Sequence, residues 1–246
     1  MKKKMISAIL VCILALAMVA PLTAYAAWEK QANGTWKYKD DNTGYYLTGW
    51  AEGNSGNVYY FDASGTMQTG WQKIDGIWYY FDEWYGYMYY SSTYDDGGQI
   101  YAFDQNGALL YGNGWKKLIG WDGTVLWVFL KNNLAQTGWL DGGGGKWYYL
   151  YPTSGYMIDD GCKTGDYLSL FNSNGVWKGY YKTPGWIHVG DDWYYINSDG
   201  TIKTGWLTLS GKKYYLDPDY GYMLANGYYT IGGTEYEFDE SGALVQ

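Results

Sequence analysis

The chain has 246 residues, of which 21% are aromatic, and it contains 36 glycines, one histidine and no arginine. Its 17 basic residues are outnumbered by 25 acidic ones, which gives a formal net charge of −8 at pH 7. A nucleic-acid partner is not expected, because an acidic chain without arginine is poorly suited to phosphate backbones. A zinc site needs about four ligands, which His188 and Cys162 cannot supply, and we expect no cofactor.

The first 26 residues are predicted to be a secretory signal peptide. Lys2-Lys3-Lys4 precedes a largely apolar, uncharged run over residues 5–20, and Ala24-Tyr25-Ala26 has the small-x-small form found before a cleavage site. The run is shorter than the roughly 18 residues of a membrane-spanning helix. We therefore expect export, no membrane span after cleavage, and a secreted domain over residues 27–246 that is retained at the surface by its folded part.

One short aromatic motif recurs ten times between residue 34 and the C-terminus. Successive copies are 20 to 26 residues apart, and all six phenylalanines occupy the fourth position of a copy. The strong copies are Val58-Tyr-Tyr-Phe61, Trp78-Tyr-Tyr-Phe81, Trp147-Tyr-Tyr-Leu150, Trp193-Tyr-Tyr-Ile196 and Lys213-Tyr-Tyr-Leu216. Such self-similarity at a fixed period is typical of repeat architectures.

Each copy is predicted to belong to a β-hairpin. A run of aromatic and β-branched residues is followed by a turn with glycine, a large apolar residue and then, in most copies, Gly-Trp. Since a lone hairpin is marginal in water, each must pack on its neighbours. The sequence therefore predicts an all-β fold, a β-solenoid of about ten stacked hairpin repeats of roughly 20–26 residues. Residues 111–123 interrupt the rhythm and are predicted to form a longer loop.

The pattern from Gly70-Trp71 to Trp78-Tyr-Tyr-Phe-Asp82 resembles the choline-binding, or cell-wall-binding, repeats of Gram-positive surface proteins. The related glucan-binding repeats of glucansucrases share part of it. The resemblance covers about residues 34–246. It implies a solenoid of stacked hairpins with ligand sites between successive repeats. It also implies that choline on teichoic acid is the partner and that attachment to the cell wall is non-covalent.

The residue types agree with this implication. A quaternary ammonium has no hydrogen-bond donor, so ring faces hold it, and tryptophan gives the strongest cation–π contact. In the family, a site takes the Gly-Trp tryptophan, the first aromatic residue of the same hairpin and a tyrosine of the next hairpin. The most complete match is Trp186, Trp193 and Tyr215. Trp71 and Trp78 form a pair whose third place holds Ala102, so this site is expected to be weaker or to use Tyr101. The other candidates are Trp139 with Trp147, where Leu170 holds the third place, and Trp50 with Tyr80.

Several copies depart from the family pattern. Val58 stands where Trp50 needs a second ring, Lys213 would repel a cation beside Trp206, and Cys162 replaces a tryptophan. We therefore expect two to four working sites among the ten repeats. The rings of the remaining copies, including Tyr79 and Phe81, are interpreted as packing residues.

Four functions are compatible with the sequence. The first is a non-catalytic module that binds choline on teichoic acid or a wall glycan, and the alternative is an α-glucan or other carbohydrate binder, since sugars also stack on tryptophan and tyrosine. A third is an adhesive surface protein whose repeats bind another protein. Enzymatic activity is not expected, because the repeats leave no second domain that would form a cleft. The oligomeric state is left open.

Overall fold

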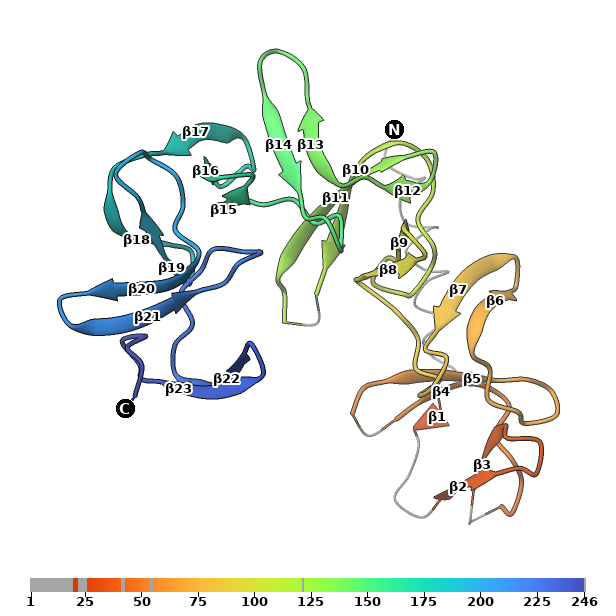
Figure 1. Ribbon diagram of the computed structural model, residues 1–246. Helices are drawn as coiled ribbons and strands as arrows, with labels where there is room; N and C mark the ends of the chain where they lie inside the picture. The colour runs from red at the N-terminus through yellow and green to blue at the C-terminus, as the bar shows by residue number, and fades with distance from the viewer. Residues whose placement is uncertain (1–19, 22–25, 41–42, 54, 121, 246) are drawn as a thin grey trace. The chain divides into compact units, whose positions relative to one another are not determined.

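The computed structural model describes residues 20–21, 26–40, 43–53, 55–120 and 122–245 (Figure 1). The predicted signal peptide falls almost wholly outside these residues. The chain divides into two compact units. Unit 1 runs to Gln136 and includes Thr153–Gly155, and unit 2 comprises Thr137–Pro152 and Tyr156–Gln246.

All the regular structure in the described residues is β, which confirms the all-β prediction. None of these residues forms a helix that could span a bilayer. The strands of unit 1 are β1 Ala20–Pro21, β2 Ala26–Lys30, β3 Trp36–Asp40, β4 Gly49–Glu52, β5 Val58–Phe61, β6 Gly70–Ile74, β7 Ile77–Phe81, β8 Thr93–Asp96, β9 Gln99–Ala102, β10 Gly114–Ile119, β11 Val125–Lys131 and β12 Leu134–Ala135. Those of unit 2 are β13 Gly138–Asp141, β14 Trp147–Leu150, β15 Gly161–Thr164, β16 Tyr167–Phe171, β17 Trp177–Tyr181, β18 Gly185–Val189, β19 Asp192–Ile196, β20 Gly205–Leu209, β21 Lys212–Leu216, β22 Gly227–Ile231 and β23 Thr234–Phe238.

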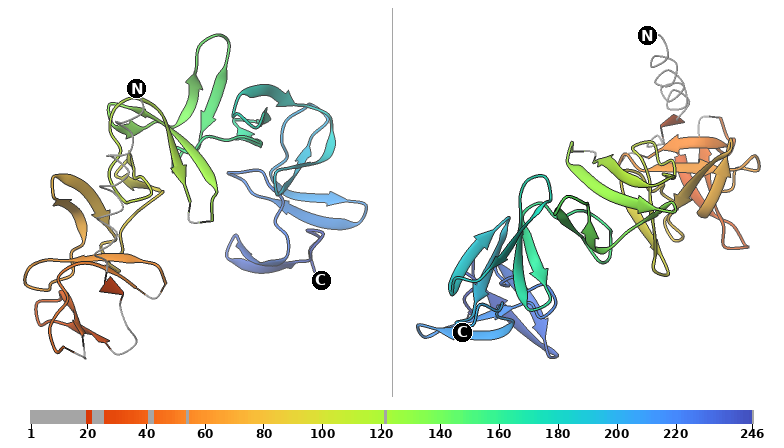
Figure 2. Two further views of the ribbon diagram at one scale, coloured as in Figure 1. Left: turned by 180° about the vertical axis from the view of Figure 1, so that it is seen from behind. Right: turned by 90° about the horizontal axis from the view of Figure 1, so that it is seen from above.

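Consecutive strands pair as antiparallel hairpins, as predicted (Figure 2). The repeating pairs are β2–β3, β4–β5, β6–β7, β8–β9, β10–β11, β13–β14, β15–β16, β18–β19, β20–β21 and β22–β23. In most of them the glycine of Gly-Trp lies opposite the fourth motif position, as Gly70 lies opposite Phe81. The following tryptophan, Trp71, then lies opposite Tyr80.

The turn after most motifs is fixed by an aspartate, as Asp62 shows. The Asp62 carboxylate accepts hydrogen bonds from the backbone N–H groups of Ser64 (2.8 Å) and Thr66 (3.0 Å), and Gly65 takes a φ of 76°. The Ser64 hydroxyl, the largest influence, and these amides lower the pKa of Asp62. Aspartate and glycine therefore recur because the turn needs a side-chain acceptor and a left-handed residue.

Successive hairpins within a unit are joined by backbone hydrogen bonds and by a row of buried rings. The N–H of Met67 donates to the carbonyl of Trp36 in the preceding hairpin (2.8 Å). The same bond runs from Met88 to Val58, from Leu109 to Trp78, from Met223 to Trp193 and from Leu244 to Lys213. Phe61, Phe81, Phe103 and Phe238 are at most 1% exposed, so the fourth motif position forms the core.

Two predictions about the middle of the chain are wrong: the loop at residues 111–123 and the place of Phe129 in the fourth motif position. Residues 111–123 are not a loop, because they contain β10, which pairs with β11. In this hairpin Gly114 lies opposite Leu130, which is fully buried, while Phe129 is only half-buried. The register has slipped by one residue, and a slip of one residue sends each side chain to the opposite face of a strand.

Candidate functional site

Trp71 and Trp78 form a corner on one face of hairpin β6–β7. Trp71 lies opposite Tyr80 and Lys73 lies opposite Trp78, so both indoles project from the same face. Their ring centroids are 6.3 Å apart and their planes meet at 85°. Trp78 is 37% exposed, so one wall of the corner faces solvent.

The next hairpin closes a second side of this corner. Tyr101 of β9 lies 4.7 Å from Trp71, with an interplanar angle of 73°, and the buried Phe103 lies 5.8 Å from the same indole. The structure therefore brings Tyr101, and not Ala102, to Trp71 and Trp78. We call Trp71, Trp78 and Tyr101 the Trp71 site. The side chain of Asp96 accepts a hydrogen bond from Trp71 Nε1 (3.3 Å), which places a negative charge beside the rings.

The same arrangement recurs in unit 2. Trp186 and Trp193 lie 6.5 Å apart at 82°, and Tyr214 lies 5.2 Å from Trp186 at 68°. We call Trp186, Trp193 and Tyr214 the Trp186 site. Tyr215, the tyrosine predicted for this site, does not lie at Trp186. It contacts Trp206 (5.1 Å), which lies opposite it in its own hairpin.

A third site of this kind was missed by the sequence analysis. Trp28 and Trp36 lie 6.5 Å apart at 87°, and Tyr59 of the next hairpin lies 5.3 Å from Trp28 at 64°. These three residues form the Trp28 site. Alanine precedes Trp28, whereas glycine precedes Trp71 and Trp186, and Trp28 lies two residues beyond the predicted cleavage point. The available signal was the eight-residue spacing to Trp36, close to the seven residues from Trp71 to Trp78.

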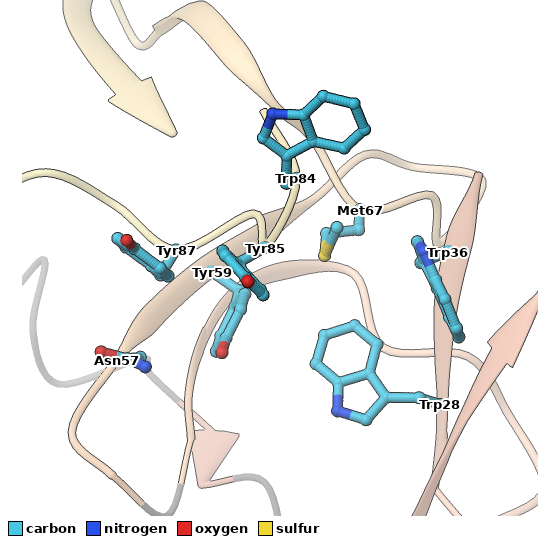
Figure 3. A pocket seen from close by; sticks show the side chains of 8 residues that line it. All are labelled: Trp28, Trp36, Asn57, Tyr59, Met67, Trp84, Tyr85 and Tyr87. Atoms are coloured by element: carbon cyan, nitrogen blue, oxygen red, sulfur yellow. The ribbon is translucent and has the colours of Figure 1, made fainter. Parts of the chain in front are cut away.

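The Trp28 site opens into a cavity of about 620 Å³ (Figure 3). Met67, whose N–H bonds the Trp36 carbonyl, lines it together with the three site rings. Leu109 and Met223 hold the corresponding place beside Trp78 and Trp193, because their amides bond those carbonyls (2.9 and 2.7 Å). An apolar residue from the following repeat is therefore a fourth component that the sequence analysis did not assign.

The sequence-predicted pair Trp50 and Tyr80 is not brought together. Trp50 contacts Tyr79 of the next hairpin (4.9 Å), and no second indole is available because Val58 replaces it. Tyr80 is 3% exposed and stacks on Tyr94 with centroids 3.8 Å apart. Burial, the largest influence, raises the pKa of Tyr80 well above its usual range. Tyr80 is thus a core residue.

Trp139 and Trp147 also differ from the prediction. Trp139 contacts Phe171 (6.0 Å) and Trp177 (5.5 Å) of the neighbouring sheet. Within its own hairpin its ring partner is Tyr149 (5.2 Å) and not Trp147. Trp147 lies opposite Asp141 and is 41% exposed. Trp177 takes the place that a tyrosine holds in the three sites.

Basic side chains lie beside the second indole of every site. The Nζ atom of Lys30 is 5.8 Å from the Trp36 ring centroid, and that of Lys73 is 5.9 Å from the Trp78 centroid. His188, opposite Trp193, lies 4.9 Å from its ring. These residues share the cross-strand position of the hairpin, so each indole already has one cation or potential cation as a neighbour.

Cys162 occupies a Gly-Trp position and makes no ring site. Its thiol is largely buried, and this desolvation, followed by the proximity of Asp160, raises its pKa to about 12. The thiol is therefore protonated near neutral pH. Among the described residues, histidine, cysteine and acidic side chains nowhere gather in a group of three that could hold a metal ion.

Comparison with known proteins finds repeat matches in four segments of the chain. The putative cell wall binding repeat matches residues 48–67, 69–84 and 137–157. The choline-binding repeat matches residues 183–228. Glucosyltransferase-S of Streptococcus downei is 44% identical over 57 residues, which is 23% of this chain and 4% of that protein. The chain thus aligns with only a small part of this curated relative.

Solved structures that this chain resembles include two from Streptococcus pneumoniae. Choline binding protein F is 24% identical, with 91% of this chain and 94% of that chain covered and a TM-score of 0.31. CbpJ is 22% identical, with 89% and 94% covered and a TM-score of 0.27. The matched segments contain Trp71 with Trp78, and Trp186, Trp193 and Tyr214. Four segments of the chain thus match models of choline-binding or putative cell wall binding repeats.

Proposed function

We propose that the protein is a non-catalytic cell-surface module that binds choline on teichoic acid through the Trp28, Trp71 and Trp186 sites. The observation that carries this is the recurrence of one three-ring geometry. In all three sites the indole centroids are 6.3–6.5 Å apart at 82–87°, and a tyrosine of the next hairpin lies 4.7–5.3 Å from the first indole. The matches to choline-binding and cell wall binding repeats support the same ligand.

The chemistry of the sites suits a quaternary ammonium. Each good ring contributes roughly 0.5–2 kcal/mol to binding a desolvated cation, so three rings give affinity on the order of millimolar. A polymer that displays choline repeatedly would engage several sites at once, which raises the overall affinity by about 10²–10⁴. The acidic balance of the chain also favours a cationic ligand.

Localisation follows from the same proposal. The predicted signal peptide would export the chain, and multivalent choline binding would then hold it non-covalently at the wall. Weak individual sites are compatible with this role because retention depends on their number.

Equilibrium titration with choline chloride tests the proposal, with tryptophan fluorescence and calorimetry as readouts. We expect saturable binding in the millimolar range with three sites per chain, and two sites for Trp193→Ala. The matched control Trp127→Ala replaces an indole that is 36% exposed and lies outside the three sites, and should leave the stoichiometry unchanged. Absence of a saturable signal at high millimolar choline contradicts the proposal.

Carbohydrate binding is the second candidate function. It is favoured by the 44% identity, over 57 residues, to a protein named for transferring glucosyl units. Chromatography separates the two candidates. Retention on a tertiary-amine resin and elution by free choline supports the first, whereas retention on dextran alone supports the second.

A further inference from the structure

The turn after β7 exposes two large aromatic side chains that packing does not require. Trp84 is 86% exposed and Tyr85 is 71% exposed. This turn is one residue longer than the turn after β5, since Gly86 follows Phe81 by five residues and Gly65 follows Phe61 by four. Exposed aromatic clusters on a folded protein mark interaction sites.

The turn is well ordered by local hydrogen bonds. The Asp82 carboxylate accepts bonds from the backbone N–H groups of Trp84 (2.9 Å) and Tyr85 (2.7 Å). Tyr85 and Tyr87 lie nearly parallel, with centroids 6.1 Å apart and planes 12° apart, and Tyr87 and Tyr89 continue the row at 6.2 Å and 23°. The backbone of the turn is therefore fixed, and Tyr85 belongs to a row of nearly parallel rings.

This row of rings borders the Trp28 site. A Cβ atom on Gly86 would lie 2.5 Å from the Met67 side chain, so the turn lies directly against the apolar wall of that site. Trp84, Tyr85 and Tyr87 line the same cavity as Trp28, Trp36 and Tyr59 (Figure 3). Figure 3 shows the turn residues on one side of the cavity and the two indoles of the site on the other.

The size and lining of the cavity define its ligand. Its volume of about 620 Å³ lies within the roughly 300–1,000 Å³ range of sites for drug-sized ligands, so a trimethylammonium group fills only part of it. None of its eight lining residues is charged, and Asn57 with three tyrosines provides the polar groups. Flat ring faces with neutral hydrogen-bonding groups suit a sugar ring, which has apolar C–H faces and hydroxyl edges.

Unit 2 contains a similar row without the site. Tyr220 and Tyr222 are stacked at 5.8 Å and 11°, and Tyr151 lies 6.1 Å from Tyr220. Gly221 in that turn packs against Ile202, but the nearby Gly-Trp position holds Cys162. Pro218-Asp219 also stands where the first turn has Glu83-Trp84. Unit 2 therefore supplies a matched control for the row itself.

We propose that the cavity of the Trp28 site binds a choline-substituted saccharide at two points. The trimethylammonium group lies in the corner of Trp28 and Trp36, and a neutral sugar ring of the same molecule stacks on Trp84 and Tyr85. This inference rests on the proposed function and adds to it a saccharide subsite that distinguishes the Trp28 site from the other two. Loss of the sugar contact is expected to weaken binding about tenfold, which corresponds to about 1.4 kcal/mol.

The test uses the full chain carrying Trp78→Ala and Trp193→Ala, in which the Trp28 site is the remaining three-ring site. Two probes are titrated by calorimetry: choline chloride, and a choline-bearing teichoic-acid repeat unit. Adding Trp84→Ala and Tyr85→Ala should weaken binding of the repeat unit about tenfold and leave the choline affinity within twofold. Tyr220→Ala should alter neither.

The inference is overturned if the turn substitutions leave the affinity for the repeat unit unchanged, or lower it only in proportion to the choline affinity. Circular dichroism and the unfolding midpoint establish that the variants remain folded. If the unsubstituted chain binds no choline at all, the proposed function fails first, and the two failures are therefore distinguishable.

Discussion

The Trp71 site and the interface around Trp206 have the same packing contacts and differ in one ring. Trp71 lies 4.7 Å from Tyr101 and 5.8 Å from Phe103, and Trp206 lies 5.1 Å from Tyr236 and 6.1 Å from Phe238. Where the first has Trp78, the second has Lys213. These two ring contacts between hairpins therefore form with or without the second indole.

This difference separates the residues that hold the hairpins together from those available to a ligand. The first indole contacts the buried phenylalanine of the next hairpin, which leaves no exposed surface on Phe103. At the Trp71 and Trp186 sites the second indole is the more exposed one, at 37% for Trp78 and 43% for Trp193, whereas in the Trp28 site the first indole is 39% exposed and Trp36 is less exposed. At the Trp71 site we therefore expect stability to depend chiefly on Phe103 and its contact with Trp71, and Trp78 to contribute mainly to binding.

Phe103→Ala gives the largest expected effect on this comparison. Removing a fully buried phenylalanine costs about 3–5 kcal/mol, and nearest-neighbour contacts are the main source of stability in a stacked array. Urea unfolding followed by tryptophan fluorescence measures the loss. The comparison variant Trp78→Ala should lose less than about 1 kcal/mol of unfolding free energy. Equal losses for the two variants would contradict the division of roles.

Trp36→Ala should remove the Trp28 site and cost some stability, because Trp36 packs against the buried cluster that contains Tyr38 and Phe61. Loss of one ring lowers the affinity of a site by about 0.5–2 kcal/mol, so the number of sites detected at low millimolar choline should fall from three to two. Calorimetric stoichiometry is the measurement, and Trp127→Ala is again the control. A stoichiometry of three after the substitution would show that Trp28, Trp36 and Tyr59 are packing residues only.

The site was partly predictable from the sequence, and the failures share a physical cause. The repeat pattern predicted the hairpins, and the family resemblance paired Trp71 with Trp78. Neither identified Tyr214, because each hairpin presents to its predecessor the face opposite to the one that carries its own indoles. That rotation between hairpins is a tertiary property, and alternation within one strand does not encode it.

The slip at Phe129 has a similar origin. The sequence spacing places Phe129 in the same motif position as Phe103, but the pairing of β10 with β11 brings Leu130 into the core. Register depends on which pairing buries more apolar surface and on the adjoining turns. A motif count alone therefore overestimates the regularity of the middle of the chain.

Lys213→Trp should convert the Trp206 interface into a fourth site. Trp206 and Tyr236 are already 5.1 Å apart at 73°, and the new indole would occupy the position that Trp78 holds in the Trp71 site. The choline stoichiometry should rise from three to four at a similar affinity. Lys212→Trp is the matched control, since alternation sends that side chain to the other face of β21. An unchanged stoichiometry would mean that the first indole and tyrosine are not yet arranged for a ligand.

Lys73→Gln gives the smallest expected effect and concerns the charge beside the rings. The Nζ atom of Lys73 lies 5.9 Å from the Trp78 centroid, where it repels a second cation at the same indole. Exposed charge pairs interact by about 0.2–1 kcal/mol, so the substitution should strengthen choline binding at the Trp71 site by less than about fivefold. The gain in affinity is measured by titrating a chain that carries Trp36→Ala and Trp193→Ala, so that the Trp71 site is the remaining three-ring site.

Raising the salt concentration to about 1 M shortens the screening length to about 3 Å and should abolish the gain in affinity from Lys73→Gln. Lys131→Gln, on an exposed position away from the three sites, should show no gain at either salt concentration; a gain for both variants would indicate that net charge, and not the lysine at the indole, controls the affinity.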